Sequence, residues 1–261
     1  MTPKPEVTTA FLHYTMGCSE EMLRQIGRTE EAEKCHAYTV GAKKAYQHYY
    51  INQELLETEH MACLVRPLAF DLAPQEQKRE IAAALNRMAV KRDYTVGTGF
   101  LATPYLLPAL AENGYLDTAY RMLENTKASG WLAMVSQGAT TVWEGYLGFD
   151  EAGHPKNSSM NHYAMGSVCS FLFEYVCGIT VVAENRFRIR PLPGGSLQFA
   201  KAEEETPYGR IAVMWEREEN TIRYIVSVPA NTTAVLQLSG EPEQVLVPGE
   251  YQFLTRNGET L

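Results

Sequence analysis

Residues 160–193 read MNHYAMGSVCSFLFEYVCGITVVAENRFRIRPLP, and within them the spacing of apolar residues changes from helical to alternating. Apolar side chains run almost unbroken from Ala164 to Ala183, but Glu174 lies inside the run and Gly178 interrupts it. A membrane-crossing helix needs about 20 consecutive apolar residues with few or no charges. We therefore expect a buried helix over Met160–Cys177, a turn at Gly178 and strands after it, rather than a membrane span.

Upstream of this change, apolar residues recur with helical spacing. Thr8 or Thr9 is expected to cap a first helix and Thr29 to open a second, so that the two form an antiparallel pair. Pro104 and Pro108 are expected to break the start of a later helix. The seven expected helices cover approximately residues 8–26, 29–46, 52–70, 75–88, 97–114, 116–125 and 160–177.

Downstream of Gly178, short alternating segments are separated by Gly, Pro and Asn turns, which is typical of a β-sandwich. Glu218, Glu219 and Asn220 are expected to form a tight turn between two strands that share an apolar face. The expected strands are RFRIRPLP, SLQFAKAEEE, GRIAVMWERE, TIRYIVSVP, TAVLQLSG and YQFLTR. The sequence thus predicts an α+β multidomain chain, with helical hairpins over residues 1–180 and an antiparallel β-sandwich domain over residues 181–261.

Composition narrows the classes of function. The 261 residues carry a formal net charge of −8 without clusters of Lys and Arg, which argues against nucleic acid as a partner. Five scattered cysteines, an odd number, suit free thiols in a reducing compartment. The N-terminal segment MTPKPEVTTAFLHY lacks the apolar core of a secretory signal. We therefore expect a cytoplasmic protein that binds neither nucleic acid nor a membrane.

The chemistry has to be sought among carboxylates, because the other common catalytic patterns are missing from the sequence. No two pairs of His and Cys have zinc-ligand spacing, there is no G-x-S-x-G motif, and GTGF at residues 97–100 lacks the preceding strand and the GK[ST] of a phosphate-binding loop. We expect neither a metal nor a cofactor.

Glu144 is the carboxylate with the least ordinary surroundings. It lies between Trp143 and Gly145, with Asn161 and His162 downstream. A carboxylate beside an indole can have a tuned pKa, and an aromatic face can pack on a sugar. On these residues alone, a Glu that caps a helix or forms a salt bridge is the competing interpretation.

Longer motifs favour the sugar interpretation. The blocks TGFLATPYLL, WLAMVSQGATTVWE and NHY occur in this order, followed by IRPLPGG. In these blocks the chain resembles the bacterial α-L-rhamnosidases, inverting glycoside hydrolases of family 78. The resemblance implies part of an (α/α)6 toroid with a rhamnose pocket at its centre, followed by an antiparallel β-domain. It also implies that Glu144 is the general base, that Trp131 and Trp143 line the sugar pocket, and that His162 binds sugar hydroxyls.

One departure from the family bears on activity. An inverting glycosidase needs a second carboxylic acid, about 6.5–9.5 Å from the first, to protonate the leaving oxygen. In this family the acid lies in a D-E-R-x-G-W-x-G-D block, and these 261 residues contain no such block. The seven or so expected helices are also too few for a whole toroid, so the chain resembles its second half.

Three hypotheses follow. The chain is the C-terminal part of a rhamnosidase with little turnover, whose exposed apolar helix faces associate with a second copy or with a missing N-terminal half. Alternatively, it is an active hydrolase that recruits Glu54, Glu57, Glu59 or Glu112 as the acid. The third hypothesis is a non-catalytic carbohydrate-binding or structural module. In the first two the ligand is a rhamnosylated carbohydrate or glycoside.

Overall fold

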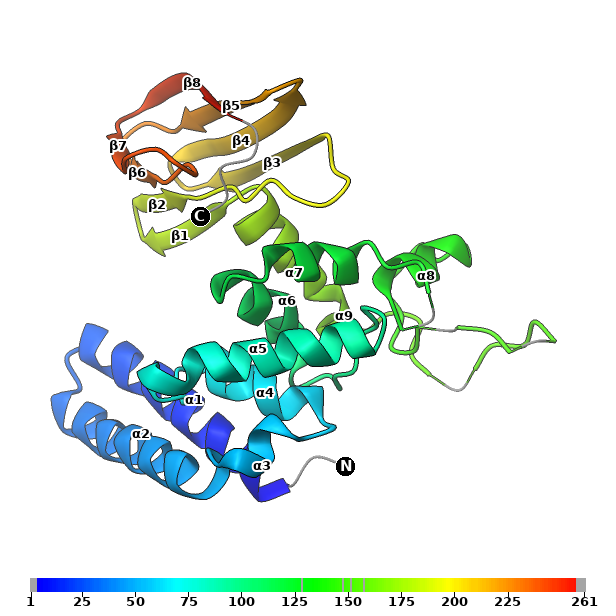
Figure 1. The fold of residues 1–261 in the computed structure, drawn as a ribbon. Helices are drawn as coiled ribbons and strands as arrows, with labels where there is room; N and C mark the ends of the chain where they lie inside the picture. The colour runs from blue at the N-terminus through cyan, green and yellow to red at the C-terminus, as the bar shows by residue number, and fades with distance from the viewer. Residues whose placement is uncertain (1–3, 128, 147, 151, 157, 257–261) are drawn as a thin grey trace. The chain divides into compact units, whose positions relative to one another are not determined.

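The structure, a computed structural model, describes residues 4–127, 129–146, 148–150, 152–156 and 158–256. The chain forms two compact units, which divide between Met165 and Gly166. Helices come first and strands follow, as Figure 1 shows, so the predicted order of helical hairpins and then antiparallel sheets is confirmed. Among the described helices, none is long and apolar enough to cross a membrane. The first strand begins at Ile179, and the domain boundary at residue 180 stays a prediction.

The first hairpin pairs α1 (Lys4–Gln25) with α2 (Thr29–Tyr50). The predicted cap at Thr8 or Thr9 is wrong, because α1 already includes Lys4 and both hydroxyls donate backward within the helix. Thr8 Oγ1 lies 2.7 Å from the Lys4 carbonyl oxygen, and Thr9 Oγ1 lies 2.8 Å from that of Pro5. Pro5 is tolerated there because the first helical turn needs no amide donor at that position.

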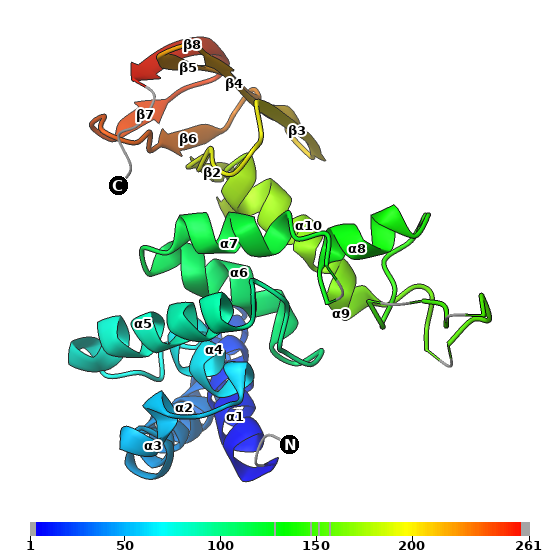
Figure 2. The same ribbon diagram turned by 45° about the vertical axis from the view of Figure 1, so that its right-hand side comes forward.

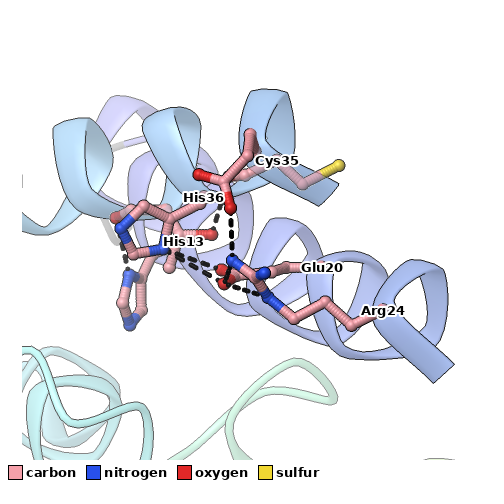
Figure 3. A network of polar contacts seen from close by, with 7 residues as sticks. His13, Glu20, Arg24, Cys35 and His36 are labelled. Carbon is pink, nitrogen blue, oxygen red and sulfur yellow. Dashed lines mark hydrogen bonds and ion pairs between the residues drawn. The ribbon is translucent and has the colours of Figure 1, made fainter. Parts of the chain in front are cut away.

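Polar contacts also join the outer surfaces of α1 and α2 (Figure 3). Arg24 of α1 donates to Glu20 on its own helix at 3.1 Å and to Glu33 of α2 at 2.8 Å. A ring nitrogen of His36 lies 3.1 Å from the same Glu20 carboxylate, and His13 Nδ1 lies 3.0 Å from the Thr39 carbonyl oxygen. Exposed ion pairs contribute little to the free energy of folding. The apolar and buried polar contacts between the two helices therefore stabilise the hairpin.

The single helix expected over residues 52–70 is wrong, because the segment forms two helices, α3 (Gln53–Leu56) and α4 (Met61–Ala69). Asn52 caps α3 by accepting from the Leu55 amide at 3.1 Å. Thr58 Oγ1 accepts from the His60 amide at 3.2 Å. Side-chain acceptors that satisfy backbone amides locally compete with continued helix, and here they hold a turn between α3 and α4.

Two further hairpins follow, formed by α4 with α5 (Gln75–Lys91) and by α6 (Thr103–Glu112) with α7 (Leu116–Leu123). The expectation that Pro104 and Pro108 break α6 is wrong, because Pro104 lies in its first turn and Pro108 lies inside it. Sequence reasoning also missed α8 (Trp131–Ser136), a short helix formed by the first six residues of the WLAMVSQGATTVWE block.

The helix expected over Met160–Cys177 begins later and is interrupted. It comprises α9 (Tyr163–Gly166), α10 (Val168–Phe171) and η1, a π-helical turn over Leu172–Val176. The π-turn is closed by the Cys177 amide, which donates to the Leu172 carbonyl at 3.0 Å. Gly178 then makes the expected turn at φ 80°, and a Cβ at this position would lie 2.1 Å from the Pro191 nitrogen, so only glycine fits.

Over residues 166–256, the strand unit has two four-stranded sheets, and both views of the chain show them as two layers (Figures 1 and 2). One has the order β3 (Phe199–Thr206), β4 (Gly209–Glu218), β5 (Thr221–Val228) and β8 (Gly249–Arg256), all antiparallel. The other has the order β1 (Ile179–Ala183), β2 (Arg186–Ile189), β6 (Thr233–Leu236) and β7 (Gln244–Leu246). Strands β1 and β7 were not expected, and β2 pairs with β6 in parallel, which departs from the purely antiparallel prediction.

The predicted turn between β4 and β5 is confirmed, because Glu218 pairs with Thr221 across Glu219 and Asn220. The expected shared apolar face is also present, with Trp215 opposite Tyr224 and both buried. The Trp215 indole donates to the Val176 carbonyl at 2.7 Å, which anchors the end of η1 against the sheet.

Candidate active site

Glu144 and His162 are brought together by backbone pairing between two loop segments. The Glu144 amide donates to the Ser159 carbonyl at 2.9 Å, and the His162 amide donates to the Val142 carbonyl at 2.8 Å. Thr141 Oγ1 also donates to the Met160 carbonyl. These hydrogen bonds close the intervening loop. Glu144 and His162, 18 positions apart in the sequence, therefore belong to two segments that are joined by backbone hydrogen bonds.

The Glu144 carboxylate is exposed and lightly held. Its Oε2 accepts from the Ser159 amide at 3.1 Å, and within the described residues no other hydrogen bond or ion pair reaches this side chain. Glu144 therefore neither caps a helix nor forms a salt bridge with a described residue, the competing interpretation of the sequence. One carboxylate oxygen is available to a water molecule or a ligand.

The His162 ring contacts two aromatic side chains. It stacks on Tyr163 with ring centroids 5.4 Å apart and meets the edge of Phe100 at 6.4 Å. Its Nδ1 is buried and makes no hydrogen bond with any described residue. A buried ring nitrogen without a partner costs free energy, so Nδ1 is, among the described residues, an unpaired polar atom at the side of the loop that carries the NHY motif.

The two tryptophans of the predicted pocket are both buried in this unit. Trp131, the first residue of α8, donates from Nε1 to the Met165 carbonyl at 3.0 Å, and its ring meets the edge of Tyr146. Trp143 packs edge-on against Phe149 with centroids 5.6 Å apart. In the described contacts, both tryptophans therefore pack against neighbouring residues of the helical unit. Their role in lining a sugar pocket stays a prediction.

Sequence reasoning missed the aromatic side chains that surround the site. Phe100 and Tyr163, whose rings contact His162, are both exposed. Phe100 belongs to the GTGF segment and Tyr163 to the NHY motif, so the motif comparison could have drawn attention to both. Tyr146, two residues after Glu144, donates to Met165 Sδ at 3.4 Å, and burial raises the pKa of its phenol above the usual range. Such placements depend on chain folding and leave no periodic signal.

The candidate acids of the second hypothesis stand on other elements of the helical unit than Glu144. Glu54 lies in α3, Glu57 and Glu59 lie in the turn between α3 and α4, and Glu112 is the last residue of α6. All four are exposed. Among the described contacts, none joins Glu57 or Glu59 to Glu144, but both line a cleft of 590 Å³ together with Arg87, Lys91 and Arg92.

Family comparisons agree with the motifs. The family model described as bacterial alpha-L-rhamnosidase 6 hairpin glycosidase domain matches residues 1–176, and the one described as bacterial alpha-L-rhamnosidase C-terminal domain matches residues 185–252. Among curated proteins, an alpha-L-rhamnosidase of Formosa agariphila is 30% identical over 262 residues, covering 98% of this chain and 28% of that protein. One of Streptomyces avermitilis is 29% identical over 251 residues, covering 94% of this chain and 24% of that protein.

Solved structures give the same result. The α-L-rhamnosidase of Aspergillus terreus superposes with a TM-score of 0.88 at 30% identity, covering 94% of this chain and 30% of that one. The Streptomyces avermitilis α-L-rhamnosidase, solved in complex with L-rhamnose, superposes with a TM-score of 0.90 at 25% identity, covering 97% and 27%. The chain thus spans between 24% and 30% of the length of these relatives.

Proposed function

Because this chain belongs to the bacterial α-L-rhamnosidase family, as its motifs predicted, we propose that it carries the general-base side of a site that releases L-rhamnose from α-L-rhamnosides. The observation that carries the proposal is the exposed Glu144 carboxylate, held by one backbone amide beside a histidine whose Nδ1 is unsatisfied among the described residues. The α-L-rhamnosidases named above are much longer proteins, of which this chain covers less than a third. Rhamnosidase activity of this chain is therefore part of the proposal.

The roles of the proposed site residues follow from their contacts. The Ser159 amide fixes one oxygen of Glu144, and the other oxygen accepts a proton from the attacking water as that water approaches the anomeric carbon. His162 binds sugar hydroxyls through its ring nitrogen, and the aromatic faces of Phe100 and Tyr163 offer packing surface for the C–H side of a sugar. Trp131 and Trp143 line the base of this pocket.

The missing acid motif limits the expected rate. General acid or base assistance contributes roughly 10²–10⁴-fold each. Nitrophenolate is a stable anion, so an aryl rhamnoside can be cleaved with little protonation of the leaving oxygen. The leaving oxygen of a disaccharide is a poor leaving group unless a general acid protonates it. We therefore expect slow cleavage of an aryl α-L-rhamnoside and no measurable cleavage of a rhamnosyl disaccharide.

The test compares the purified chain with Glu144→Gln and with Glu241→Gln, an exposed carboxylate in the strand unit that serves as the matched control. Glu144→Gln is expected to abolish the aryl activity, and Glu241→Gln to leave it unchanged. In Glu144→Ala, azide should restore cleavage and yield the inverted rhamnosyl azide, because an anionic nucleophile needs no general base. Robust hydrolysis of the disaccharide would refute this proposal and favour an acid recruited from Glu54, Glu57, Glu59 or Glu112.

A non-catalytic carbohydrate-binding module is the alternative. It predicts binding of L-rhamnose without any hydrolysis, and a Glu144→Gln variant that still binds. The unsatisfied Nδ1 of His162 is compatible with both functions and does not decide between them. The azide experiment does, because only a catalytic site would form the rhamnosyl azide.

We also propose that the α1–α2 hairpin is covered by another protein surface, either a second copy of the chain or the other half of a toroid. Large apolar side chains are exposed along it, namely Leu12, Tyr14, Met22, Ile26, Tyr38 and Tyr49. Burying about 1,000 Å² of apolar surface contributes on the order of 25 kcal/mol before the costs of association. A monodisperse monomer in light scattering at micromolar concentration would contradict association of two copies, and a lack of binding of an apolar dye would contradict an uncovered apolar face.

The compartment is a further proposal. All five cysteines, Cys18, Cys35, Cys63, Cys169 and Cys177, are free thiols, which suits the cytoplasm.

A further inference from the structure

The cleft of 590 Å³ in the helical unit is the feature that the proposed catalytic site leaves unexplained. One wall is the turn between α3 and α4, with Glu57, Thr58 and Glu59. The other wall is the C-terminal half of α5, with Arg87, Lys91 and the following Arg92. Its volume lies in the range of about 300–1,000 Å³ that holds small ligands.

The charges of this cleft differ from those on the rest of the chain. The whole protein is acidic, with a net charge of −8, yet this cleft gathers three cations against two carboxylates. Elsewhere arginines close directly on carboxylates, as Arg223 does on Glu216 at 2.6 Å. All five charged side chains of the cleft are exposed, and within the described residues no ion pair or hydrogen bond joins them to another group.

An ordinary solvated helix face is the competing interpretation. Lys91 lies in the last turn of α5, where a cation offsets the negative end of the helix dipole. Arg87, a turn earlier, is also exposed and lines the cleft, and the helix dipole gives no reason for a cation at that position.

The exposed Arg92 side chain lies against Gly97. A Cβ built at Gly97 would lie 2.6 Å from Arg92 Nε, so the guanidinium packs against the glycine backbone. Gly97 begins the segment that carries Phe100, the ring that contacts His162. The loop of residues 97–100 therefore connects the cleft wall to the proposed rhamnose site.

We propose that the cleft binds a uronate, a sugar that bears a carboxylate. The carboxylate lies on Arg87, Lys91 and Arg92, because guanidinium groups offer paired donors to a planar carboxylate. Glu57, Thr58 and Glu59 accept hydrogen bonds from the sugar hydroxyls on the opposite wall. A phosphate dianion fits less well, because Glu57 and Glu59 repel the extra charge. That the ligand is a sugar rests on the proposed function.

The test is binding of D-galacturonate to the whole chain, measured by ligand-observed NMR, with D-galactose, acetate and inorganic phosphate as comparison ligands. Arg87→Gln/Lys91→Gln is expected to weaken galacturonate binding about tenfold or more, because charge-assisted hydrogen bonds are lost. The matched control is Lys34→Gln/Lys44→Gln, two exposed lysines on α2, and it should bind as the wild type does. Circular dichroism melting establishes that each variant is folded.

Gly97→Ala provides a second, independent variant. It displaces Arg92 without removing a charge, and it should weaken galacturonate binding as well. Binding that is unchanged in both the double variant and Gly97→Ala would overturn the proposal. So would galactose, acetate or phosphate binding as tightly as galacturonate.

L-Rhamnose binding separates this proposal from the proposed function. Rhamnose should bind equally to the wild type and to Arg87→Gln/Lys91→Gln, and it should be lost in His162→Ala. Loss of rhamnose binding from every protein, with galacturonate binding intact, would remove the proposed function and leave an anionic-sugar site.

Discussion

Two carboxylates in the helical unit show how differently one side-chain type is used. Glu6 in α1 is buried, and it accepts from Arg66 Nε of α4 at 2.9 Å and from the Tyr46 hydroxyl of α2 at 2.5 Å. Arg66 also donates from its second nitrogen to the other Glu6 oxygen and contacts Cys63 Sγ at 3.8 Å. Glu144 is exposed, with one backbone donor among the described residues.

The difference separates a carboxylate that joins helices from one that is available for chemistry. Both oxygens of Glu6 accept hydrogen bonds from Tyr46 and Arg66, which lie 40 and 60 positions away in the sequence. The negative charge of Glu6 is therefore neutralised by Arg66 inside the protein. The Glu144 carboxylate keeps an oxygen open to solvent. A buried, saturated carboxylate indicates a structural role, whereas an exposed one beside an unsatisfied histidine indicates a site.

The largest expected effect comes from removing the cation of the buried network. Arg66→Met leaves the Glu6 charge buried and unpaired, so it should lower the free energy of unfolding by about 3–5 kcal/mol. Urea unfolding followed by circular dichroism measures the change. Arg24→Met, which removes an exposed arginine from Glu20 and Glu33, is the control and should have a small effect.

A double variant sharpens this result. Glu6→Leu/Arg66→Met removes both charges and should recover much of the lost stability, because apolar side chains of similar size can replace a buried ion pair. If the double variant were as unstable as Arg66→Met, shape rather than charge would account for the loss.

The next effect concerns the third member of the network, Tyr46. Burial, with a further contribution from the Glu6 charge, raises the pKa of its phenol above the usual range. Tyr46→Phe should cost roughly 1.5–3 kcal/mol at neutral pH, because a hydrogen bond to a charged group is lost. Tyr49→Phe on the exposed side of α2 is the matched control.

The same variant has a pH signature. Because the pKa of Tyr46 is raised in the folded state, its contribution to stability is complete below about pH 10, where the unfolded phenol ionises, and is lost as the pH rises further. The fall in unfolding free energy above pH 10 should therefore be shallower in Tyr46→Phe, by up to about 1.4 kcal/mol per pH unit. An unchanged alkaline slope would show that Tyr46 does not stay neutral when folded.

The fold was largely predictable from local pattern, and its errors share one cause. Helical periodicity located α2, α5 and α7, and alternation located β4 and β5. The errors at Thr8, at residues 57–60 and in the parallel pairing of β2 with β6 involve backbone groups whose partners are chosen by neighbouring structure. A threonine can cap a helix or donate within one, and its position along the chain does not decide between them.

The candidate site was predictable only through motifs. Glu144 and His162 stand in conspicuous blocks, and the backbone hydrogen bond between Val142 and His162 brings those blocks together. Glu6 and Arg66 drew no notice, because neither has an unusual neighbour and their pairing spans 60 residues. Long-range pairing of charges leaves no local signal in a single sequence.

The smallest expected effect is the one that tests the comparison most directly. Glu144→Gln keeps an oxygen that can accept from the Ser159 amide and removes only an exposed charge, so the free energy of unfolding should change by less than about 0.5 kcal/mol. Glu6→Gln makes the same chemical change at the buried position, where Arg66 would lose its counter-charge, and it should be far more destabilising. Urea unfolding of the two variants side by side, under identical conditions, measures the contrast. A loss above about 1 kcal/mol in Glu144→Gln would assign that carboxylate to the support of its loop, and any loss of activity in the variant would then reflect a displaced loop rather than a missing base.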